Sequence, residues 1–113
     1  MANSFALGRF DNGGIDAITT VGTAQAGAPL LTGAVNVLTT AAGQVGALLP
    51  RDAAFGSPIL VRVNTATAAT VFPPTGGSIN GGAANAAFSV AQNKPTAFYC
   101  LPNGIDYIAV LSA

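Results

Sequence analysis

Residues 59–64, ILVRVN, decide the fold class because apolar and polar side chains alternate along them. Ile59, Val61 and Val63 fall on one face of an extended chain. Arg62 falls on the other face, which gives the two-residue period of a half-buried β-strand. Valine and isoleucine also favour strands, because their branched side chains pack well on a pleated surface. We therefore expect a strand here, with Arg62 turned outward.

Similar short runs lie on both sides of this segment, at the spacing of roughly 8–12 residues that is typical of sandwiches and barrels. The runs expected to form strands are residues 15–21, 34–40, 45–49, 59–64, 69–72, 87–90, 97–101 and 105–111. Turn-forming clusters separate them, above all PPTGG at 73–77, NGG at 80–82 and PNG at 102–104. The pattern predicts an all-β protein, a single β-sandwich or jelly-roll-like barrel of about eight short strands. We expect this domain to span residues 15–113, after an N-terminal arm at residues 1–14.

One segment is also compatible with a helix. Residues 83–92 are rich in alanine, which favours a helical turn in isolation. No other segment has a helical period over more than two turns. Stretches rich in threonine and alanine recur near residues 23–28, 39–42 and 65–70, but at no fixed period, which argues against a solenoid.

The chain is unusually poor in charge. Its 113 residues include four basic and four acidic side chains, or 7% charged, against about 25% in ordinary soluble domains. It has no histidine, which excludes a histidine base, a Ser-His-Asp triad and histidine metal ligands. Its single cysteine, Cys100, cannot form an internal disulfide or a thiolate zinc site. We therefore expect a non-enzymatic protein without a cofactor or a metal.

The same scarcity of charge bears on partners. A folded chain of this mass has a surface of roughly 5,600 Å², which eight charges cannot cover. Because a net charge near zero promotes association, we expect much of this surface to lie against copies of the chain or a larger assembly. Nucleic acid is not an expected partner, since the basic residues are few and scattered.

A membrane is not expected either. The longest uncharged stretch, residues 17–50, is interrupted by Gly22, Pro29 and Asn36 among others, so no window of about 20 residues is apolar enough to span a bilayer. The first ten residues lack the basic and apolar regions of a signal peptide. The expectation is a protein made and used without Sec export.

Several residues are candidates for sites. Cys100 lies in an apolar run, and the nearest base in the sequence is Lys94. Since a nucleophilic cysteine needs a cationic or histidine neighbour, we expect a buried structural thiol. Asp11 and Asp16 could contribute to a cation site, but calcium loops use more acidic residues at fixed offsets, so we expect turn formation and capping of a strand instead. The pairs Gly76-Gly77 and Gly81-Gly82 lack the lysine and the strand-to-helix context of a phosphate loop.

The remaining candidates concern contacts between proteins. Arg51 and Asp52 are adjacent charges in a loop, where they form either a seam between subunits or a solvated turn. Phe5 and Phe10 are aromatic anchors on the arm, which pack back on their own domain or dock on a neighbouring subunit. The predicted subunit or capsid interface comprises Phe5, Arg9, Phe10, Arg51, Asp52, Phe55 and Arg62.

Much of the chain, roughly residues 17–111, resembles small virion proteins of tailed bacteriophages. The segments that carry the resemblance are VNVLTTAA at 35–42, LLP at 48–50, VRVN at 61–64, AFSV at 87–90, FYC at 98–100 and, most of all, VFPPTGGSING at 71–81. They resemble head decoration, or cement, proteins, which are β-rich, often trimeric, and clamp neighbouring major capsid subunits. The resemblance implies a homotrimer, made in the host cytoplasm, that binds the major capsid protein on the capsid exterior.

Two alternatives stay open. A tail or fibre accessory module would bind a cell-surface glycan, with Tyr99, Tyr107 and several asparagines as candidate contacts, although no tryptophan is present for stacking. An enzyme would depend on Cys100 or an aspartate, and the sequence has no histidine to act as a base beside either of them.

Overall fold

A computed structural model describes residues 14–53 and 57–112. Those residues form eight strands and no helix. The strands are β1 (Ile15–Thr19), β2 (Val35–Thr39), β3 (Gly46–Leu48), β4 (Ile59–Val63), β5 (Ala69–Phe72), β6 (Phe88–Val90), β7 (Thr96–Cys100) and β8 (Tyr107–Leu111). Each matches one of the eight expected runs, so the all-β class is confirmed. The expected arm, residues 1–14, lies outside the described residues except for Gly14.

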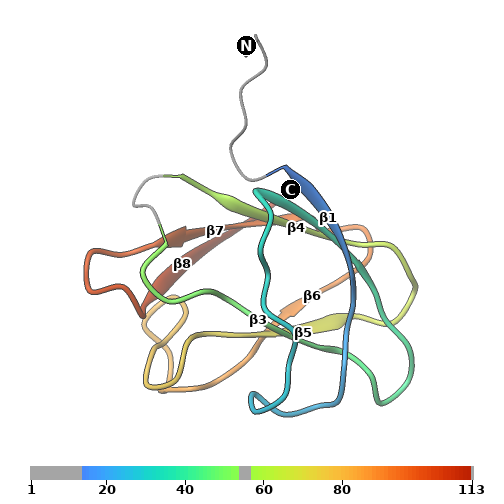
Figure 1. The fold of residues 1–113 in the computed structure, drawn as a ribbon, viewed down its shortest axis with the longest axis horizontal. Helices are drawn as coiled ribbons and strands as arrows, with labels where there is room; N and C mark the ends of the chain where they lie inside the picture. Colours follow the sequence, from blue (N-terminus) through green and yellow to red (C-terminus); the bar gives the residue numbers. More distant parts are fainter. Residues whose placement is uncertain (1–13, 54–56, 113) are drawn as a thin grey trace, which may run out of the picture.

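The strands form two sheets that face each other as in a β-sandwich (Figure 1). The larger sheet has the order β1-β2-β4-β7-β8, and the smaller one has the order β3-β5-β6. Pairing is mixed: β1, β2 and β4 run parallel to one another, whereas β7 and β8 join antiparallel. In the smaller sheet β3 is parallel to β5 and β6 is antiparallel to it. A jelly roll is built from antiparallel strands, so a mixed sandwich is the better description.

The parallel pairs arise because the first half of the chain winds between the two sheets. After β1 the chain crosses to the smaller sheet, where Val21 N–H donates to the Gly46 carbonyl and Leu31 N–H donates to the Leu48 carbonyl. It then returns to the larger sheet as β2, crosses again as β3, and returns as β4. Parallel neighbours need a long crossover connection, and here each crossover runs along the opposite sheet.

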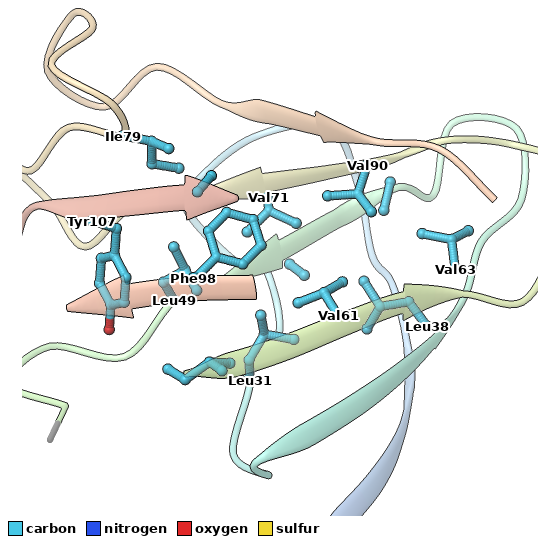
Figure 2. Packing of buried hydrophobic residues seen from close by; sticks show 14 of the residues in the cluster. Leu31, Leu38, Leu49, Val61, Val63, Val71, Ile79, Val90, Phe98 and Tyr107 are labelled. Carbon is cyan, nitrogen blue, oxygen red and sulfur yellow. The ribbon is translucent and has the colours of Figure 1, made fainter. Parts of the chain in front are cut away.

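The core lies between the sheets (Figure 2). From the larger sheet, Leu38, Val61 and Phe98 point inward, and each is at most 1% exposed. Val71 and Val90 point toward them from the smaller sheet, both fully buried. The alternation along β4 is confirmed, since Ile59, Val61 and Val63 are buried while Leu60 and Arg62 are exposed.

A polar side chain is buried on β2. Val35 and Val37 lie on the outer face of this strand, and Asn36 points inward with Leu38. The Asn36 carboxamide accepts a hydrogen bond from Gly33 N–H (3.1 Å) and donates to the carbonyls of Gly33 (2.9 Å) and Leu60 (3.3 Å). Burial of this amide is tolerated because its hydrogen-bonding atoms have partners.

The alanine-rich residues 83–92 form a turn followed by β6, so the helical alternative is wrong. Asn85 adopts a left-handed conformation (φ 65°), which interrupts any helix, and asparagine tolerates it better than most residues. Its side-chain oxygen accepts a hydrogen bond from Gly76 N–H at 2.7 Å. Gly77 in the same loop has no room for a side chain, because a Cβ there would lie 1.8 Å from the Ile105 carbonyl oxygen.

The two edges of the larger sheet differ. At the β8 edge, Asn80 pairs with Ala109 as a strand would: its side-chain oxygen accepts from Ala109 N–H at 2.9 Å, and its amide donates to the Ala109 carbonyl at 3.4 Å. Backbone bonds between Tyr107 and residues 78–80 extend this cover. At the β1 edge, by contrast, none of the described residues bonds to the outward-facing backbone of Ile15, Ala17 and Thr19.

We expect acid to weaken the turn that precedes β8. Hydrogen bonds from Asn103 (2.7 Å) and from Ser78 N–H (2.8 Å) hold the pKa of the Asp106 carboxyl below its ordinary value. A carboxyl whose pKa is lower in the folded state contributes stability above its unfolded pKa, and this contribution is lost as the pH falls through the folded pKa. Asp106→Asn should therefore lose less melting temperature than the wild type between about pH 6 and about pH 2. Equal losses in thermal melts of the two proteins would contradict this.

Candidate interaction surface

The outer face of the larger sheet carries an apolar row that crosses all five strands. The strand registers align Ile15 with Val35, Val35 with Leu60, Leu60 with Ala97, and Ala97 with Val110. We call these five residues, Ile15, Val35, Leu60, Ala97 and Val110, the outer row. Since side chains of directly paired residues lie on the same face of a sheet, the row is continuous from the β1 edge to the β8 edge.

The outer row is open to solvent within the described structure. Ile15 is 75% exposed, Val110 52% and Leu60 40%. Ile108, 43% exposed, extends the apolar surface next to the row, where it pairs with the half-buried Tyr99. Single exposed apolar residues are common on protein surfaces, but a contiguous group of them marks an interaction site.

The outer face has almost no charge. Its outward-facing strand residues include one charged side chain, Arg62 on β4. Asp16 is also on β1, but it points toward the inner side and accepts a hydrogen bond from the Thr32 hydroxyl. The outer face therefore offers a partner mainly apolar contact, with one cationic position.

The outer face of the smaller sheet is different in kind. It carries the polar residues Thr70 on β5 and Ser89 on β6, which pair with each other. The large apolar residue on the same face, Phe72, is only 8% exposed. The Gln25 amide donates to the Pro73 carbonyl at 2.7 Å and to Asn85, which ties two loops together at this sheet. The large open apolar surface thus belongs to the larger sheet.

A depression of about 370 Å³ adjoins the outer row at the start of β2 and β4. It shares Val35 and Leu60 with the row, and its walls include Leu31, Pro58 and Ile59. Because its lining is chiefly apolar and holds no charged side chain, the depression extends the apolar surface and offers no evident chemistry.

The structure places the predicted interface residues in several locations. Arg62 points outward as expected. The Arg51 guanidinium donates to the Thr75 carbonyl at 3.1 Å, and Asp52 N–H donates to the Gly104 carbonyl at 2.8 Å. Both therefore make contacts within the chain, in a turn where Asp52 is left-handed (φ 59°). The other predicted positions, Phe5, Arg9, Phe10 and Phe55, lie outside the described residues.

Sequence reasoning did not single out the outer row. A signal was present, because the runs containing Leu60, Ile108 and Val110 place apolar residues at both odd and even positions. A strand that is apolar at both parities is buried or contacted on both faces. Among the charged side chains that the structure describes, those of Asp16, Arg51 and Asp106 form hydrogen bonds within the chain.

Two candidates for chemistry lie in the core. Cys100 is buried as expected, and its thiol donates to the Leu101 carbonyl at 3.5 Å. Tyr107 is 1% exposed, and its hydroxyl donates to the Pro50 carbonyl at 2.5 Å. Burial raises the pKa of the Tyr107 phenol far above its ordinary value, so the group is neutral at physiological pH. A tyrosine in this position offers no platform to a sugar.

No protein-family model matches the sequence, and no curated protein or solved structure matches it. Among the described residues there is no cluster of metal-binding side chains. The same part of the chain holds no helix that is long and apolar enough to cross a membrane. The candidate site of this protein is the outer row, because its exposed apolar side chains form a contiguous surface across the larger sheet.

Proposed function

We propose that this protein is a non-enzymatic structural protein of a phage particle, a decoration protein that stabilises the capsid by binding across junctions of the major capsid protein. The observation that carries the proposal is the outer row, an apolar stripe across a five-stranded sheet with one charge on the whole face. The resemblance of residues 71–81 to cement proteins points to the same function.

The physical argument concerns the cost of leaving this face in water. Burial of an exposed Val, Leu or Ile side chain contributes about 1.5–3 kcal/mol, and Ile15, Leu60 and Val110 are each at least 40% exposed. A capsid junction that covers these side chains gains the part of this contribution that is still exposed, about half of it per side chain, and needs few matching charges. Shell binding by contact area is also consistent with a chain that has no histidine and only four acidic and four basic residues.

The proposed homotrimer strengthens such a contact. The outer face measures roughly 24 Å by 16 Å, from strand spacing and rise per residue, or about 400 Å². This is the projected area of the sheet, and the accessible surface of its side chains is larger, but the face is still modest beside the roughly 800 Å² of accessible surface that each partner buries in a standard protein interface. Three copies that bind together multiply a modest contact through effective concentration, so a trimer on a symmetric shell can stay bound through small faces.

The test replaces one residue of the outer row. We expect Leu60→Asp to lower the affinity for empty capsids of the virus that encodes the protein by at least about tenfold, because a carboxylate would be buried in an apolar contact. The measurement is co-sedimentation of purified protein with capsids. Sedimentation equilibrium of the same samples gives the oligomeric mass, for which a trimer is expected.

The matched control is Leu30→Asp, because Leu30 is 47% exposed and lies beside β3, at the smaller sheet. This variant should bind capsids like the wild type. If Leu60→Asp loses its β-type circular dichroism, Val110→Asp on the edge strand replaces it. Wild-type protein that does not sediment with capsids, or a Leu60→Asp variant that binds as tightly, would overturn the proposal.

Labelling the protein within virions separates the shell from the tail. Copies distributed over the whole shell support a decoration protein. A few copies at one vertex would indicate the tail or fibre module instead.

A further inference from the structure

We propose that residues 1–13 of the same chain bind across the outer row in the free protein. The capsid then displaces this segment when the protein docks. Four observations support it: the place where the segment joins the described fold, the length and the composition of the segment in the sequence, and the size of the face.

The segment joins the fold at one end of the outer row. Gly14 precedes Ile15, the first and most exposed residue of the row. The Gly14 carbonyl accepts hydrogen bonds from Ala34 N–H (3.0 Å) and Val35 N–H (3.2 Å), which fixes this attachment point on the sheet. The positive φ of Gly14 (66°) lets the chain leave the plane of the strand here.

The segment is long enough to cross the face. Its 13 residues reach about 43 Å when extended. The five strands span about 19 Å from β1 to β8. A segment anchored at the β1 edge can therefore cover the row to its far end and still have several residues to spare.

The chemistry of the segment matches that of the face. Met1, Phe5, Leu7 and Phe10 are large apolar residues, which the outer row can cover. The segment also contains Asp11, three residues before Gly14 and so within about 10 Å of it. The lone charge of the face, Arg62, is on β4, two strand spacings or about 10 Å from β1. An ion pair between Asp11 and Arg62 is thus within reach.

The size of the face favours a segment over a second copy. A standard interface buries about 800 Å² of accessible surface on each partner, whereas the strands of this face have a projected area of only roughly 400 Å². A short tethered segment needs no such area, because the tether provides a high effective concentration.

The first test uses free protein and disulfide trapping. We expect the Ala6→Cys/Ala97→Cys variant to form an intramolecular disulfide under mild oxidation at least about tenfold faster than the matched pair Ala6→Cys/Ala91→Cys. Ala97 belongs to the outer row, whereas Ala91 is exposed just after β6, at the smaller sheet. Cys100 is 4% exposed and stays in both variants. Monomers with the intramolecular disulfide are identified by intact mass and by non-reducing electrophoresis.

The trapping experiment has three possible outcomes. Fast intramolecular trapping supports the proposal. A disulfide-linked dimer would show that the segment of a second copy occupies the row, and equal rates for the two pairs would show that nothing does. Either of these outcomes overturns the proposal.

The second test separates the segment from the proposed function, on which only the displacement by the capsid rests. Phe5→Ser/Phe10→Ser should raise the fluorescence of an apolar-surface dye in free protein several-fold, while Ala2→Ser/Ala6→Ser leaves it unchanged. The phenylalanine variant should bind capsids at least as tightly as the wild type, because the competitor is weakened. Weaker capsid binding would mean that the segment is itself the capsid anchor. If neither the wild type nor any variant binds capsids, the proposed function is wrong. The dye and trapping experiments, which use free protein, still show whether residues 1–13 bind the outer row.

Discussion

Phe98→Ala is expected to lower the free energy of unfolding by about 3–5 kcal/mol, the range for deletion of a buried aromatic ring. Phe98 is fully buried on β7, near the middle of the core. Its ring packs against Phe88 edge to face, with 5.8 Å between the ring centroids, so alanine would lose this contact and leave a cavity between the sheets. Because small domains are stable by about 5–15 kcal/mol, the variant would retain little stability. Urea denaturation followed by circular dichroism measures the change.

The neighbouring position supplies the control for this experiment. Tyr99 is the next residue on β7, half-buried on the outer face. Tyr99→Ala should cost clearly less, about 1 kcal/mol, since partial exposure removes most of the cavity term. Similar losses for the two variants would show that Phe98 is not at the centre of the core.

Asn36→Ala is expected to cost about 3 kcal/mol through lost hydrogen bonds. The substitution removes one acceptor and two donors that serve the Gly33 backbone and the Leu60 carbonyl. A buried polar group without a partner costs about 1–3 kcal/mol. Gly33 has little room to shift, because a Cβ placed there would lie 3.0 Å from the Val35 carbonyl oxygen and 3.1 Å from the Gly14 carbonyl oxygen.

Asn64→Ala is the matched control, because Asn64 is exposed just after β4. Its expected change lies within about 0.5 kcal/mol of zero. Chemical denaturation of both variants under the same conditions gives the comparison. An Asn36→Ala variant as stable as Asn64→Ala would mean that water replaces the carboxamide without cost.

The positions of the strands could be predicted because a half-buried strand shows its two-residue period locally. Residues 61–64, VRVN, illustrate this, since apolar and polar side chains alternate within this short run. The pairing of the strands could not be predicted in the same way. Whether β2 lies parallel between β1 and β4 depends on crossovers that run along the opposite sheet, and these have unequal lengths and no shared motif. The winding is therefore invisible as a sequence repeat.

The outer row was not predicted from the sequence. The adjacent charges Arg51 and Asp52 indicated either a seam or a solvated turn; they lie in a turn, where the Arg51 guanidinium and the Asp52 backbone N–H form hydrogen bonds within the chain, and the seam stays a prediction. The outer row depends on registers between strands that are far apart in sequence, such as Ile15 with Val35 and Ala97 with Val110. A surface that forms only when distant strands pair is difficult to predict from a single sequence.

The contrast between the two edges of the larger sheet has a consequence for association. In terms of polymer chemistry, a sheet with two open edges is a bifunctional monomer, which adds copies at both ends and grows into a fibre. Asn80 caps one end by occupying the backbone groups of Ala109. Within the described structure the sheet is then monofunctional: it can add one strand at β1, after which growth terminates. This protein has few charges to keep its copies apart, and the turn at residues 78–80 blocks the addition of further copies at the β8 edge.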